Sequence, residues 1–198
     1  MSRFVVILTI TWTLSAAVAA QEHTPRRPSN PAPTPTTAPR INAVDPNDAG
    51  WVKFTSELGR FSVLMPEIPE DKVETTPSEH GPYTTHLFVV RDKEKENVFL
   101  IGFVDYDPSF NFNRQSELAA NRDNFVKGIK ATLISTRPLQ IDGYQALEFV
   151  AETAERTFKS RVYMVGRRPY QIVIGYPKDQ EDTLTINRFF NSFKVRQY

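Results

Sequence analysis

The stretch TFKSRVYMVGRRPYQIVIGY, residues 157–176, decides the fold of this chain. On both sides of Gly166–Pro169, β-branched and aromatic residues alternate with a period of two, which is typical of β-strands. Gly166–Pro169 fits a hairpin turn, with the proline setting the backbone and with Arg167 and Arg168 pointing to solvent. The alternative is that the arginine pair binds an anion. Because charges on turns are usually solvated, the sequence favours the plain hairpin tip.

Further strand signals lie on the N-terminal side of this hairpin. WVKFTSELGRFSVLMP, residues 51–66, predicts a strand, a turn at Glu57 to Gly59, and a second strand. The apolar face of that second strand consists of Phe61, Val63 and Met65. The segment PEIP, residues 66–69, should end it because proline cannot donate to a ladder. Another hairpin is predicted from residues 83–106, with its turn in the charged segment DKEKEN.

Two segments have the periodicity of amphipathic helices. The first should begin after Asn113 as its N-cap and end at Gly128. Its apolar stripe consists of Leu118, Ala119, Phe125, Val126 and Ile129. The second should run from about Asp179 to Phe193, with acidic residues in its first turn, where the helix dipole favours negative charge. The apolar stripe of this second helix consists of Ile186, Phe189, Phe190 and Phe193.

These elements together predict the fold class. ATLISTR, residues 131–137, reads as a strand, and Asp142-Gly143 is a tight-turn signal that leads into the strand YQALEFVAE. Two helices separated by runs of strands indicate an α/β (α+β) domain, in which helices pack on the faces of a mostly antiparallel sheet.

The N-terminal part of the chain predicts export. Arg3 precedes an apolar run over residues 4–14 and the small residues SAAVAA, so residues 1–20 are expected to be a signal peptide. An uncleaved anchor is the alternative, although the run is short for a membrane span. Residues 21–50 hold seven of the fifteen prolines and are expected to be a disordered tether rather than a PxxP ligand. A single domain is predicted over 51–198.

Composition narrows the setting and the partners. The chain has no cysteine, so disulfides, thiol-based sites and a lipid-attachment cysteine are excluded. No Asn-x-Ser/Thr acceptor is present, which favours a bacterial periplasmic or secreted location. Removing Arg3 with the signal leaves 23 basic residues against 23 acidic ones. We therefore expect no nucleic-acid partner and no membrane insertion after cleavage.

Four stretches carry a resemblance to a known family. They are W51…F54…ELGRFSVLMPEIPE, DGYQALEF, RVYMVGRRPYQIVIGY and the terminal phenylalanine-rich helix. In these stretches the chain resembles the PsbP-like α/β/α sandwich group, which includes extrinsic photosystem proteins and many small secreted bacterial proteins of unknown function. The resemblance spans about Trp51 to Phe193 and rests on positions that set the fold. It implies a non-enzymatic binding or accessory role.

Several catalytic chemistries lack their motifs. No two of the eight glycines lie closer than nine positions, so no phosphate- or dinucleotide-binding loop is present and we expect no cofactor. No Gly-x-Ser-x-Gly elbow accompanies the histidines. His80 and His86 with Asp105 and Asp107 are candidate zinc ligands. Such spacing is common by chance, and the plainer interpretation is that both histidines lie on a solvent-exposed loop before a strand. Asp105, Asp107 and Glu148 are candidate acid–base carboxylates.

Three hypotheses for function remain. The first is an exported, non-catalytic binding module for an unknown protein or envelope partner. Its candidate binding patch consists of Arg161, Tyr163, Arg167, Arg168 and Tyr170, which would be an aromatic–cationic surface. The second is a small hydrolase or lyase that uses His86 with Asp105 or Asp107. The third is a structural envelope protein whose tether threads against a polymer layer.

We predict that the mature protein begins near Gln21, because the small residues before it fit a signal-peptidase site. N-terminal sequencing of the protein recovered outside the cytoplasm tests this. Finding Met1 at its N-terminus would contradict the prediction.

Overall fold

The computed structural model describes residues 40–41, 50–79, 81–110 and 113–196. The predicted signal peptide and His80 lie outside the described residues. Most of the predicted tether does too, but Arg40–Ile41 within it pairs with the strand that begins at Val52.

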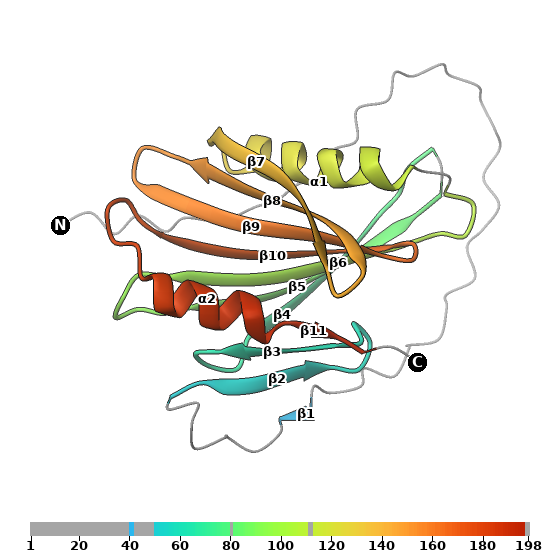
Figure 1. Ribbon diagram of the computed structural model, residues 1–198. Helices are drawn as coiled ribbons and strands as arrows, with labels where there is room; N and C mark the ends of the chain where they lie inside the picture. The colour runs from blue at the N-terminus through green and yellow to red at the C-terminus, as the bar shows by residue number, and fades with distance from the viewer. Residues whose placement is uncertain (1–39, 42–49, 80, 111–112, 197–198) are drawn as a thin grey trace.

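A seven-stranded antiparallel sheet forms the centre of the domain, with strand order β4-β5-β6-β10-β9-β8-β7 (Figure 1). Its strands are β4 (Glu70–Thr76), β5 (Tyr83–Arg91), β6 (Val98–Tyr106), β7 (Thr132–Ile141), β8 (Tyr144–Glu152), β9 (Arg156–Val165) and β10 (Arg168–Pro177). The predicted hairpins over 83–106 and 157–176 and the Asp142–Gly143 turn are all present. The mostly antiparallel sheet is therefore confirmed.

A second, smaller sheet has the order β1-β2-β3-β11. Its strands are β1 (Arg40–Ile41), β2 (Val52–Ser56), β3 (Phe61–Met65) and β11 (Lys194–Val195). The β2–β3 hairpin was predicted, with Phe61, Val63 and Met65 buried on one face as expected. No pattern in the sequence indicated that this hairpin belongs to a separate sheet.

The two helices contribute to two different apolar clusters. α1 (Arg114–Gly128) places Leu118 and Phe125 in a cluster with residues of β8, β9 and β10, such as Phe149 and Val162. α2 (Thr183–Ser192) places Ile186, Phe189 and Phe190 in a cluster with the small sheet and with alternate residues of β5, β6 and β10. Since successive strand residues face opposite sides, each central strand of the large sheet supplies both clusters. No helix among the described residues is long and apolar enough to cross a membrane.

Three elements differ from the expectation. The segment 70–76 forms the edge strand β4, which was not predicted. Six of its seven residues are exposed, and its sequence therefore lacks the apolar alternation that marks a strand. α2 begins at Thr183 rather than near Asp179, since Asp182 is its N-cap and accepts from the Thr185 N–H at 3.0 Å. α1 begins after the predicted N-cap, Asn113, and ends at Gly128, but the left-handed residue that follows it is Lys130, with φ 54°.

We predict that Phe189→Ala destabilises the protein by about 3–5 kcal/mol, because its fully buried ring would leave a cavity. Leu184 lies on the same helix and is 84% exposed, so Leu184→Ala should change the stability by less than about 0.5 kcal/mol. Urea unfolding of both variants measures the difference. A loss below about 1 kcal/mol for Phe189→Ala would mean that α2 is not docked.

Candidate functional site

The arginine hairpin has a two-residue tip. Gly166 and Arg167 form the turn between β9 and β10, and Gly166 has φ 63°, which a side chain would disfavour. The expectation that Pro169 sets this turn is wrong. Pro169 lies inside β10, opposite Met164 of β9.

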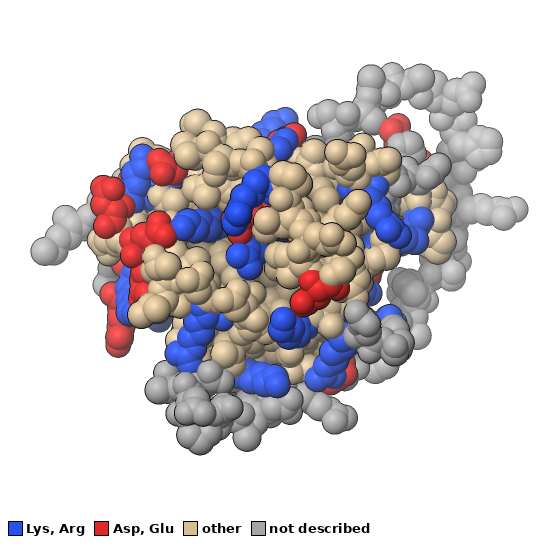
Figure 2. Space-filling model, viewed as in Figure 1, with Lys and Arg blue, Asp and Glu red and all other residues tan. Residues whose placement is uncertain are grey.

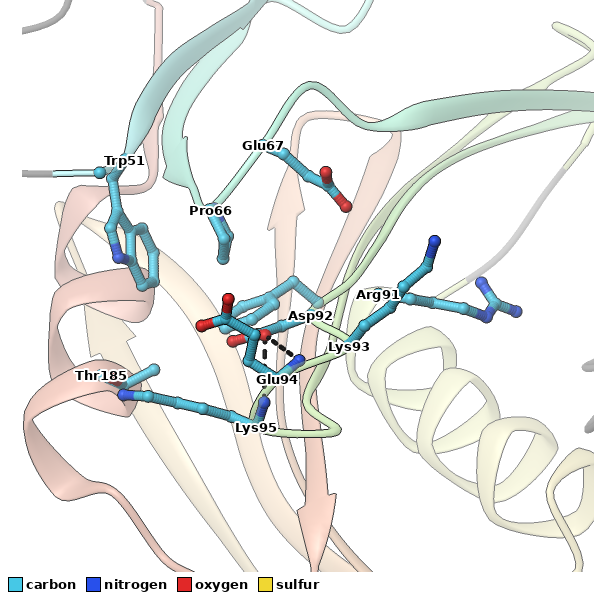
Figure 3. A pocket seen from close by; sticks show the side chains of 11 residues that line it. Trp51, Pro66, Glu67, Arg91, Asp92, Lys93, Glu94, Lys95 and Thr185 are labelled. Atoms are coloured by element: carbon cyan, nitrogen blue, oxygen red, sulfur yellow. Dashed lines mark hydrogen bonds between the residues drawn. The ribbon is translucent and has the colours of Figure 1, made fainter.

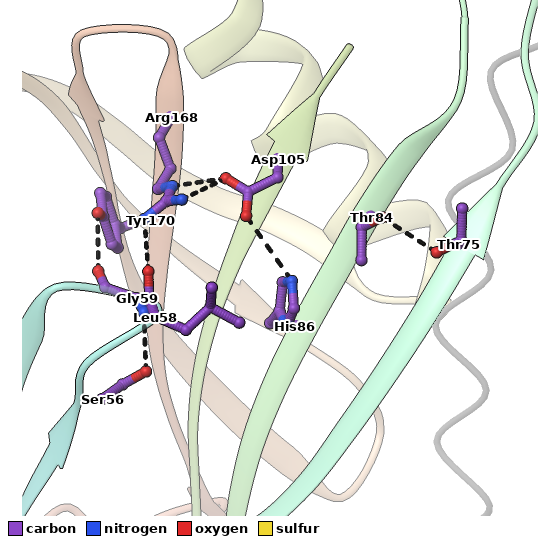
Figure 4. Close-up of polar contacts among 9 residues, drawn as sticks. All are labelled: Ser56, Leu58, Gly59, Thr75, Thr84, His86, Asp105, Arg168 and Tyr170. Carbon is purple, nitrogen blue, oxygen red and sulfur yellow. Dashed lines mark hydrogen bonds and ion pairs between the residues drawn. The ribbon is translucent and has the colours of Figure 1, made fainter. Parts of the chain in front are cut away.

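Arg168 does not point to solvent, which corrects the prediction from the sequence. Its Nε donates to Oδ1 of Asp105 at 2.7 Å, its Nη2 forms an ion pair with the same oxygen at 2.6 Å, and its Nη1 donates to the Leu58 carbonyl at 2.9 Å (Figure 4). The guanidinium carbon lies 4.8 Å from the centre of the Phe103 ring. Arg168 therefore holds the β2–β3 turn against β6, and its side chain is only 22% exposed.

Arg167 is exposed, yet it is also held. Its Nη2 donates to the Phe110 carbonyl at 2.5 Å and makes longer contacts of 3.4 Å with the carbonyls of Asp107 and Pro108. These three carbonyls belong to the segment that follows β6. The hairpin tip is thus fixed in place by two arginines that contact different neighbours.

A hollow of about 430 Å³ lies beside this tip, and we call it the arginine hollow. It is lined by Arg60, Val104, Asp105, Tyr106, Pro108, Arg167 and Arg168. Three of these side chains are cations and one is a carboxylate. Arg60 reaches the hollow from the β2–β3 turn, where its φ is 52°. The arrangement favours an anionic group, since guanidinium forks match carboxylate and phosphate geometry.

His86 and Asp105, the candidate catalytic pair, lie next to each other at the edge of this site. His86 Nε2 is 3.8 Å from Asp105 Oδ2, and the imidazole stacks on Phe103 with ring centres 4.4 Å apart. His86 is only 7% exposed, and burial lowers its pKa. The structure thus brings the pair together, and the burial of His86 restricts access to its imidazole.

The other candidate carboxylates are engaged elsewhere. Asp107 accepts from the N–H and hydroxyl of Ser109 through Oδ1, at 2.9 and 2.6 Å. Glu148 lies between Arg137 and Arg161, at 2.6 and 2.7 Å. In the part of the chain that the structure describes, no group of three or more His, Asp or Glu side chains is placed to hold a metal ion.

The aromatic members of the predicted binding patch are buried. Tyr163 and Tyr170 are 4% and 2% exposed and belong to the cluster that contains α2. The Tyr170 hydroxyl donates to the Gly59 carbonyl at 2.9 Å. Arg161 stacks on Phe190 at 4.6 Å and pairs with Glu148, away from the tip. Of the five patch residues, only Arg167 and Arg168 line the arginine hollow, which Arg60 completes without any signal in the sequence.

We predict that Arg168→Gln costs about 1–3 kcal/mol of stability, because it removes charge-assisted hydrogen bonds to Asp105 and Leu58. Arg167→Gln, at the exposed tip, should cost less than about 1 kcal/mol. Urea unfolding of the two single variants compares them. Equal, small losses would show that Arg168 does not hold the turn.

Comparison with solved structures identifies the fold. The solution structure of cyanobacterial PsbP (CyanoP) from Synechocystis sp. PCC 6803 superposes with a TM-score of 0.51 at 14% identity, covering 75% of this chain and 94% of that one. A crystal structure from Bacteroides thetaiotaomicron VPI-5482 has a TM-score of 0.33 at 15% identity, covering 73% and 48%. No family model and no curated protein matches the sequence. The chain therefore has a PsbP-like fold.

Proposed function

We propose that this protein is an exported, non-catalytic binding module, which docks an acidic group of a protein partner in the arginine hollow. The observation that carries the proposal is the convergence of Arg60, Arg167 and Arg168 on one hollow with a single carboxylate, Asp105, in its lining. The PsbP-like fold supports an accessory role, because that resemblance rests on fold-setting positions and brings no catalytic motif with it.

The charge distribution of the molecule also supports an acidic partner. The chain is nearly neutral, with a formal net charge of +1, but its charges are not mixed evenly. In Figure 2 acidic side chains gather at the left edge, where the β10–α2 connection lies, and basic side chains predominate along the lower edge over the small sheet. The arginine hollow lies at the hairpin tip, at the end of β9 and β10 opposite that acidic edge. Such a separation orients an acidic partner toward the hollow.

Two segments far apart in sequence build the cationic lining. Arg60 comes from the β2–β3 turn, and the hairpin tip supplies the other two arginines. Their mutual position is maintained by the hydrogen bonds from Arg168 to Leu58 and from Tyr170 to Gly59. The lining is thus preorganised, which lowers the entropic cost of binding.

The second candidate function is a hydrolase or lyase, favoured by the 3.8 Å approach of His86 to Asp105. The two proposals differ in what a charge-neutral change at His86 does. A binding module should retain its partner when His86 is replaced by Gln, whereas an enzyme that uses this imidazole as a base would lose its reaction.

We predict that Arg60→Gln/Arg167→Gln lowers partner recovery about tenfold or more, a loss of about 1.4 kcal/mol. The experiment is a pull-down from the producing cells' envelope fraction at low and moderate salt, and wild-type recovery should fall as salt rises. Arg168 is left intact because it also holds the fold.

The matched control is Lys72→Gln/Lys127→Gln, which removes two exposed cations from β4 and α1 and leaves the arginine hollow unchanged. This control should recover the partner as wild type does. Equal recovery by all three proteins would overturn the proposal, and so would loss of the partner in both double variants.

A further inference from the structure

A second hollow of about 430 Å³ lies at the other end of the β2–β3 hairpin, and we call it the Trp51 pocket (Figure 3). Its walls come from the residues before β2, the residues after β3, the β5–β6 turn and the first turn of α2. The lining consists of Gly50, Trp51, Pro66, Glu67, residues 91–95, Phe99 and Thr185. It shares no residue with the arginine hollow.

One wall of the Trp51 pocket is aromatic and rigid. The indole of Trp51 meets Phe99 edge to face at 5.4 Å, and Pro66 lies beside it. The guanidinium of Arg188, which does not line the pocket, is 4.9 Å from the centre of the indole. This indole therefore already stacks with one guanidinium, a contact that tryptophan favours.

The lining of the Trp51 pocket carries both signs, with three carboxylates and three cations, and the carboxylate of Glu94 is the one directed at the indole. Glu94 turns its carboxylate toward Trp51 and Pro66, while Arg91 and Lys93 extend away from them (Figure 3). Lys95 forms an ion pair with Asp182, with Nζ 3.1 Å from Oδ2. A cationic group placed between the indole and Pro66 would thus meet the Glu94 carboxylate.

The chain itself contains a segment with the complementary chemistry. Residues 24–31 read TPRRPSNP and carry Arg26 and Arg27 between two prolines. Proline-rich peptides bind aromatic-lined grooves at low entropic cost, because their extended conformation is preformed. The proline rings of this segment could pack against Trp51 and Pro66, and one of its arginines could form an ion pair with Glu94.

The length of the chain permits this contact. Arg40 pairs with Thr55 of β2, which follows Trp51 by four positions, a span of roughly 13 Å. Pro28 precedes Arg40 by twelve residues, which reach roughly 37 Å in the polyproline conformation. The segment can therefore turn back and reach the pocket.

We propose that the Trp51 pocket binds residues 25–28, Pro-Arg-Arg-Pro, of the same chain. The proline-rich segment is then anchored to the domain at this end, rather than acting as a spacer over its whole length. This proposal is independent of the arginine hollow and of its partner.

Paramagnetic relaxation tests the contact in the chain recovered after export. Because the chain has no cysteine, Thr24→Cys introduces a single site for a spin label. We expect the label to broaden the signals of the Trp51 indole and of the amides of residues 93–95, relative to the reduced label. Adding Arg26→Ser/Arg27→Ser, or Glu94→Gln, should restore most of the lost intensity, whereas the control Glu74→Gln on β4 should not.

Two outcomes would overturn the proposal. One is the absence of broadening at the pocket in the labelled wild type. The other is broadening that appears only when spin-labelled, unenriched chain is mixed with isotope-enriched chain without a label, because the occupant would then be a second copy. Preserved dispersion of the remaining amide signals confirms that each variant is folded.

Discussion

The packing of Phe61 against the large sheet is the interaction on which the rest of the structure depends. Phe61 is fully buried and contacts five aromatic rings, those of Phe54, Phe88, Phe103, Tyr170 and Phe193. These rings come from both sheets and from the end of α2. A cysteine-free domain has no disulfide between its sheets, and this aromatic contact packs them together. It also explains Gly59, where an added Cβ would lie 2.6 Å from the Phe61 ring and 2.7 Å from that of Phe103.

The same contact places the arginine hollow. With Gly59 pressed against the rings, the carbonyls of Leu58 and Gly59 come within reach of Arg168 and Tyr170 of β10. Arg60 follows directly and is carried to the hairpin tip. The core and the hollow are therefore not separate features. A substitution that loosens Phe61 should also displace Arg60.

Local signals in the sequence predicted most helices, strands and turns, whereas contacts between distant residues determine which side chains are buried and what they contact. Asn113, the Asp142–Gly143 turn and the phenylalanine stripe of α2 each act within a few residues, and each was predicted correctly. The side chain of Arg168 was placed wrongly, because its direction depends on Leu58, 110 residues earlier in the chain. β4 was missed since a charged edge strand lacks apolar alternation. Tyr163 and Tyr170 were assigned to a surface because strand alternation does not tell which face a second sheet covers.

The position of Asp105 argues for binding over catalysis at this site. In a catalytic triad, the carboxylate beside the histidine base orients the imidazole and stabilises its protonated form. Here Oδ1 of Asp105 accepts a hydrogen bond from Nε of Arg168 and forms an ion pair with its Nη2, and Oδ2 is the oxygen near His86, at 3.8 Å. Burial lowers the pKa of His86, and the charge of Arg168 acts in the same direction, while Asp105 and Asp71 oppose it. The imidazole is thus buried with a lowered pKa, and the carboxylate serves mainly to fix an arginine. That division of roles suits a rigid cationic lining better than a proton-transfer pair.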